Sequence, residues 1–158
     1  AFLALRRPDL SEPDRLLLTR LAEGSPGLAL RLAAADGLTL YRKLLDILGH
    51  LPVSRPQAML ELAELVTGKG RDESYAMFCL LLGGVLGRVA RAASGAHIVA
   101  NAEERDCLVR LAGLASLDPW IEVWEKSTGL LQRADALSLD RRQVVIGLLP
   151  DIAAVTGP

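Results

Sequence analysis

Aromatic residues are scarce in this sequence of 158 residues, at 4% of the total, and cysteine and histidine occur only twice each. So few aromatic rings argue against recognition of single-stranded nucleic acid by base stacking. Cys79 and Cys107 lie far apart among apolar neighbours and form no Cys-x-x-Cys pair, which argues against a zinc site or a disulfide framework. We therefore expect both cysteines to be reduced core residues in a cytoplasmic protein that binds no metal.

An excess of charge is also missing, because 18 basic side chains are balanced by 19 acidic ones and the formal net charge is -1. Proteins that bind duplex DNA usually carry a basic field, and none is visible in this composition. The basic residues form scattered pairs, of which Arg141-Arg142 lies near the end of the chain. We interpret these pairs as surface or subunit-interface residues.

The longest run without a charged residue, Ser74–Gly87, spans 14 residues and contains three glycines. A helix that crosses a bilayer needs about 20 apolar residues, so this run predicts a buried core helix and no membrane span. The sequence opens at Ala1 with no initiator methionine and no secretory signal pattern. We expect the chain to be a fragment of a larger protein.

Apolar residues make up 51% of the sequence and recur with helical spacing almost throughout, which predicts an all-α fold. The run from about Arg71 to Ala93 is apolar almost all round and should form the central helix. Pro150 should interrupt and kink the last helix. Ser, Asn and Asp are typical helix caps, and we expect such caps at Ser11, Ser25, Ser54, Asn101 (with Glu104 as a capping box) and Asp140 (with Gln143 as another).

Both tryptophans lie in a helix that the sequence predicts to start at Asp118-Pro119. We interpret Trp120 and Trp124 as core residues, and an exposed one would be the first candidate for an interface anchor. Glu122 and Lys126 are four residues apart, a spacing that predicts an ion pair on the wet face of the same helix.

No motif in the sequence predicts a bound cofactor. Gly68-Lys69 resembles part of a phosphate-binding loop. That motif needs a glycine where Ala63 stands and Ser or Thr where Gly70 stands. The segment is better explained as a turn that ends a helix.

Catalytic residues are not evident either. His50 and His97 each lack a cysteine or acidic residue at ligand or general-base spacing. The acidic pairs, Glu103-Glu104 and Glu122 with Glu125, lie at helix starts or on polar faces, where we expect them to be solvated. The sequence therefore predicts a protein that is not an enzyme.

Four segments resemble parts of one protein family, and they occur along the chain in the same order as in that family. Leu21–Leu32, which contains Gly24-Ser25-Pro26-Gly27, resembles the lid segment of the delta-prime subunits of the bacterial DNA polymerase III clamp loader. Gly37–Leu45 resembles the first helix of the collar domain in that family. Trp120–Lys126 and Ala134–Gln143 resemble its last two helices.

The resemblance implies an AAA+ lid over residues 1–36 and a helical collar over residues 37–158, the collar being the domain through which five subunits join in a ring. The partners implied are the delta and gamma/tau subunits, with indirect association with primed DNA and the sliding clamp in the full complex. Pro26, Gly27 and Leu28 stand where ATP-binding members carry an arginine, which fits a subunit that does not use ATP. Subunit-interface candidates on this interpretation are Trp120, Trp124, Arg141 and Arg142.

Other interpretations stay open. Within the same family, the chain could be the lid and collar of an ATP-binding gamma/tau-type subunit, against which Leu28 weighs. From other classes, it could be a helical adaptor or regulator without a replication role. A small helical enzyme would require His50 or His97 to line a deep cleft beside acidic residues.

Overall fold

The computed structural model describes residues 2–157, which fold into nine helices without a β-strand, so the predicted all-α class is confirmed. Ala1 and Pro158, the outer ends of the two predicted units, lie outside the described residues. In chain order the helices are α1 Phe2–Arg6, α2 Glu12–Leu21, α3 Pro26–Ala34, α4 Gly37–Gly49, α5 Pro56–Val66, α6 Asp72–Ala93, α7 Ala102–Ala112, α8 Leu117–Ala136 and α9 Arg141–Val155.

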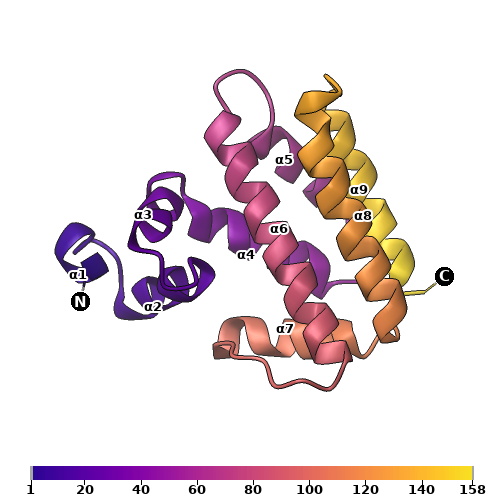
Figure 1. Cartoon of the computed structure of the whole chain (residues 1–158), viewed down its shortest axis with the longest axis horizontal. Coiled ribbons are helices and arrows are strands. Elements are labelled where there is room, and N and C mark those ends of the chain that lie inside the picture. Colours follow the sequence, from indigo (N-terminus) through magenta and orange to yellow (C-terminus); the bar gives the residue numbers. More distant parts are fainter. Residues whose placement is uncertain (1, 158) are drawn as a thin grey trace.

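Helix α6 lies at the centre of a bundle formed by α4 to α9 and packs against α4, α5, α7 and α8 (Figure 1). Phe78, Leu82 and Val85 on this helix are fully buried, which confirms the prediction of a central core helix. Acidic residues in its first turn and Arg91 in its last turn match the charges that the helix dipole favours.

Glycines let α6 and α8 approach closely. A Cβ atom added at Gly87 would lie 3.1 Å from Cζ2 of Trp124, and one added at Gly83 would lie 3.3 Å from Cγ2 of Thr128. The helix-weakening effect of glycine is therefore offset by a tight contact between the two helices.

By length and composition alone, α6 could cross a membrane, with a mean hydropathy of 1.5 over its most apolar window. Core helices of soluble proteins meet the same criterion, and 44% of this window is buried inside the fold. The hydropathy of α6 therefore says little about where the protein resides.

Most predicted helix caps are observed. Ser11 Oγ accepts a hydrogen bond from the Asp14 backbone N–H at 3.2 Å, and Ser25 Oγ accepts one from the Leu28 N–H at 3.3 Å. Asp140 Oδ1 likewise accepts from the backbone N–H groups of Arg142 and Gln143. Local sequence signals thus determine the starts of α2, α3 and α9.

Two expectations about individual helices are wrong. Ser54 does not cap α5, because Pro56 is its first residue and Arg55 occupies the capping position without a side-chain bond. Ser54 Oγ instead lies 4.0 Å from the sulfur of Met59. Pro150 does not interrupt α9, which continues as a helix to Val155, while the expected kink stays a prediction.

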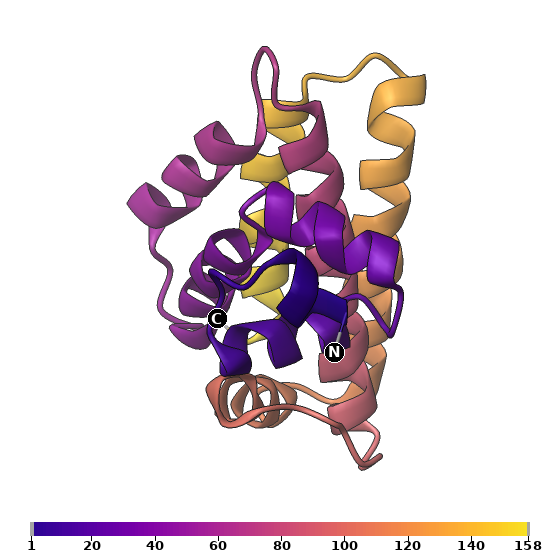
Figure 2. The same cartoon turned by 90° about the vertical axis from the view of Figure 1, so that its left-hand side faces the viewer.

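Helices α1 to α3 form a small group on one side of the bundle, here called the N-terminal unit (Figures 1 and 2). The chain leaves it at the predicted break, where Asp36 has a left-handed φ of 54° and Gly37 starts α4. A Cβ atom at Gly37 would lie 2.8 Å from the carbonyl oxygen of Leu32, so glycine is needed for this close turn. The division into two domains at this point stays a prediction.

Candidate functional site at the helix junction

A buried carboxylate, Glu104, lies where the N-terminal unit meets the bundle. Its side chain is only 1% exposed, and Oε2 accepts a hydrogen bond from Arg20 Nη2 at 2.7 Å. Oε1 accepts a hydrogen bond from the Tyr41 hydroxyl at 3.1 Å and lies 3.6 Å from Arg88 Nε. Arg88 Nη2 in turn donates to Tyr41 Oη at 3.0 Å. One carboxylate therefore connects α2, α4, α6 and α7.

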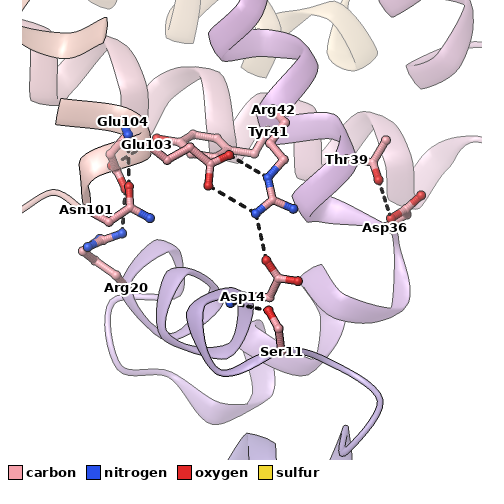
Figure 3. A network of polar contacts seen from close by, with 10 residues as sticks. All are labelled: Ser11, Asp14, Arg20, Asp36, Thr39, Tyr41, Arg42, Asn101, Glu103 and Glu104. Carbon is pink, nitrogen blue, oxygen red and sulfur yellow. Dashed lines mark hydrogen bonds and ion pairs between the residues drawn. The ribbon is translucent and has the colours of Figure 1, made fainter. Parts of the chain in front are cut away.

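The start of α7 places Glu104 in this position. Asn101 Oδ1 accepts a hydrogen bond from the Glu104 backbone N–H at 3.0 Å, as the sequence predicts (Figure 3). In a full capping box the glutamate side chain would reach back to the Asn101 N–H. Here the carboxylate points toward Arg20 and Tyr41. The expectation that Glu104 is solvated is wrong, because two guanidinium groups compensate its charge away from water.

A second, more exposed set of ion pairs lies beside the first. Arg42 on α4 donates from Nε to Glu103 Oε1 at 2.6 Å and from Nη2 to Asp14 Oδ1 at 2.8 Å (Figure 3). Arg42 therefore links α2 to α7 through α4. The residues of this set and of the set around Glu104 are together called the junction network: Asp14, Arg20, Tyr41, Arg42, Arg88, Glu103 and Glu104.

Proton affinities in the junction network follow from these contacts. Hydrogen bonds with Glu103 and then Asp14 raise the pKa of the Arg42 guanidinium, and the hydrogen bond from Arg42 lowers the pKa of the Asp14 carboxyl. Burial raises the pKa of the Tyr41 hydroxyl above its usual value of about 10. Asp14 and Arg42 thus stay charged, and Tyr41 stays neutral, over a wide range of pH.

The ion pairs and hydrogen bonds of the junction network are suited to fixing the position of the N-terminal unit on the bundle. Charge-assisted hydrogen bonds are about twice as strong as neutral ones and fix the geometry of both partners. Removing one partner of a buried pair leaves an uncompensated charge and is strongly destabilising. The network can therefore hold the N-terminal unit in one orientation against the bundle.

The predicted lid residues lie at the start of α3. Gly24 has a φ of 82°, Ser25 caps the helix and Pro26 is its first residue, followed by Gly27. Gly24, Ser25 and Pro26 also line a cavity of about 360 Å³ together with α1 and α2. The junction network lies apart from this segment.

The predicted interface residues are in different surroundings. Trp120 is fully buried, whereas Trp124 is 37% exposed and lines a groove of about 390 Å³ between α2, α3, α6 and α8. Arg141 lies 4.4 Å from the centre of the Tyr75 ring and pairs with Asp135 at 2.8 Å. Trp124 is thus the tryptophan left available for an interface.

Other ion pairs tie the bundle together. Arg141 also pairs with Asp72 at 2.6 Å, and Arg142 lies 3.4 Å from a carboxylate oxygen of Glu64. Lys126 pairs with Asp151 on α9 at 2.8 Å, so the expected partner Glu122 is wrong. A subunit contact made by Arg141 or Arg142 stays a prediction.

Histidine and cysteine lie outside the junction network. His50 is half exposed, with Nδ1 3.5 Å from Asp46 Oδ1, so the expectation that no acidic residue stands at a suitable spacing from it is wrong. It lines an open hollow with Arg42 and Glu103, and His97 lines another beside Arg105. Cys79 and Cys107 are free and half-buried, and burial raises the pKa of the Cys79 thiol to about 11. Among residues 2–157, no group of three His, Cys, Asp or Glu side chains is placed to hold a metal ion.

No family of known proteins, no curated protein and no solved structure matches this chain.

Proposed function

We propose that the chain is the lid and collar region of a bacterial DNA polymerase III clamp-loader subunit of the delta-prime type. In this role it is a non-catalytic, cytoplasmic assembly module. It packs helix on helix with delta and gamma/tau subunits in the pentameric complex that loads the sliding clamp at primed DNA.

The observation that carries the proposal is the Gly24–Gly27 segment. Its residues form a capped helix start, with Ser25 Oγ accepting the Leu28 N–H. Pro26 removes one backbone amide that could bind an anion at this helix end, and no arginine stands at position 27 or 28. These features support a lid that does not bind the phosphates of ATP.

The order of the helices gives further support. The segment that resembles the first collar helix falls on α4. Of the segments that resemble the last two, Trp120–Lys126 lies within α8, and Ala134–Gln143 runs from the end of α8 to the first turn of α9. A small helical group precedes a larger helical bundle, as a lid followed by a collar would require (Figure 1). Exposed Leu80 and Trp124 on the bundle offer apolar surface for a neighbouring helix.

A binding experiment tests the proposal. The tagged chain is mixed with purified delta, gamma and tau subunits, and complexes are recovered on the tag and sized by light scattering. We expect at least one of these subunits to be retained. A folded chain that retains none of them would contradict the proposal and favour an unrelated helical adaptor.

Two matched variants make the experiment sharper. Trp124→Ala removes the exposed tryptophan and should weaken retention, whereas Val109→Ala removes an apolar side chain that is 56% exposed on α7.

A further inference from the structure

The N-terminal unit is attached to the bundle by ion pairs at three separate places. In each, an arginine of one part binds a carboxylate of the other. These pairs are Arg20 with Glu104 at 2.7 Å, Arg42 with Asp14 at 2.8 Å, and Arg31 with Glu73 at 3.0 Å. Apolar residues of the N-terminal unit, such as Leu18 and Leu32, also belong to the same buried core as the bundle, so the ion pairs add to apolar packing at this boundary.

The covalent connection between the two parts is short. Helix α3 ends at Ala34 and α4 begins at Gly37, with Asp36 in a left-handed conformation between them. A change of backbone dihedrals at a few residues between helices is enough to reorient them. Residues 35–37 are therefore the place about which the N-terminal unit can turn.

A groove lies along the same junction. Leu21 and Leu28 of the N-terminal unit form one side of it, and Leu80 and Trp124 of the bundle form the other. Arg88 also lines this groove while its guanidinium holds Tyr41 and faces Glu104. A displacement of the N-terminal unit would therefore change both the junction network and the groove.

The junction network leaves two donors unused. Among residues 2–157, the Nε groups of Arg20 and Arg88 are buried and have no hydrogen-bond acceptor within bonding geometry. A buried donor without an acceptor is unfavourable to the folded state. Only Arg20 Nε belongs to the N-terminal unit, and Arg88 Nε still lies 3.6 Å from Glu104 Oε1, so the closed arrangement leaves one hydrogen bond of the N-terminal unit unmade.

We propose that the junction network is an electrostatic latch. While Glu104 binds Arg20, the N-terminal unit is held against the bundle and the groove beside Trp124 is narrow. When this pair is broken, the unit turns about residues 35–37 and the groove widens. The inference concerns the chain itself and does not depend on its assignment to a clamp loader.

Distance measurement between two spin labels tests the latch. The labels are placed on cysteines introduced at the exposed positions Glu12 on α2 and Glu122 on α8, with Cys79 and Cys107 replaced by alanine. Glu104→Gln keeps the size of the side chain and removes its charge. We expect a longer and broader distance distribution in this variant, together with easier quenching of Trp124 fluorescence by acrylamide.

The matched control breaks an ion pair outside the junction. Asp151→Asn removes the partner of Lys126 between α8 and α9, and it should leave the distance distribution unchanged. If Glu104→Gln unfolds the whole chain, Arg20→Met replaces it, because this change keeps the aliphatic stem and leaves Glu104 paired with Tyr41 and Arg88. An unchanged distance distribution in a folded latch variant would overturn the proposal.

Discussion

The middle of the bundle and the junction with the N-terminal unit are held together in different ways. In the bundle, Phe78, Leu82 and Val85 of α6 are fully buried among apolar side chains from neighbouring helices. At the junction, Glu104 and Arg20 form a buried ion pair, and Arg42 bridges two further carboxylates nearby. Apolar packing is nearly independent of pH and salt, whereas the junction depends on both.

The largest expected effect is on the free energy of unfolding, when a buried side chain of the bundle is shortened. Leu82→Ala creates a cavity in the bundle and should lower the free energy of unfolding by about 2–5 kcal/mol. Leu80→Ala, two residues away on the same helix, removes a side chain that is 40% exposed. This control should change stability by less than about 0.5 kcal/mol, as measured by urea denaturation. Equal effects of the two variants would mean that α6 is not the centre of the core.

The connection between the two regions should respond to an added methyl group. Gly37→Ala places a Cβ atom 2.8 Å from the Leu32 carbonyl oxygen, and the resulting overpacking should cost about 1–3 kcal/mol. Gly147→Ala in α9 meets no atom within 4 Å and should stabilise the chain by about 0.5–1 kcal/mol. Thermal unfolding of both variants measures the two changes. A Gly37→Ala variant as stable as the parent would remove the argument for a tight turn there.

The apolar bundle could be predicted from the sequence, because the residues that indicate its helices are close together along the chain. The near-continuous apolar run of α6 and the cap of α9 at Asp140 each lie within a few neighbouring residues. Even the error at Ser54 had a local remedy. Proline favours the first position of a helix, so Pro56 points to Arg55 as the residue at the cap.

The junction could not be predicted in the same way. Glu104 follows Glu103 at a helix start, where an acidic pair is normally solvated and favoured by the helix dipole. Its partner Arg20 is 84 positions away, and no spacing in the sequence connects them. Only the fold brings the two side chains together, so the burial of Glu104 had no signal in a single sequence.

A smaller change in stability is expected when an exposed ion pair of the junction is removed, and this change should depend on the salt concentration. Arg42→Met removes both exposed ion pairs of that residue and should destabilise the chain by up to about 1 kcal/mol at low ionic strength. The difference should shrink in 1 M NaCl, where the Debye length falls to about 3 Å. Lys43→Met is the matched control, since Lys43 makes no ion pair among the described residues. A difference that persists at high salt would indicate that packing of the Arg42 stem is responsible.

The smallest expected effect is a shift in one titration. The hydrogen bond from Arg42 lowers the pKa of Asp14 in the folded chain below the value of about 3.9 found in unfolded peptides. The contribution of this pair to stability is therefore present above about pH 4 and is lost as the pH falls through the lower folded value. NMR titration of the Asp14 carboxyl should give a higher pKa in Arg42→Met and an unchanged one in Lys43→Met. If the pKa stays the same in both variants, the Arg42 pair does not persist in solution, and the N-terminal unit is held by the Arg20–Glu104 and Arg31–Glu73 pairs and by apolar contacts.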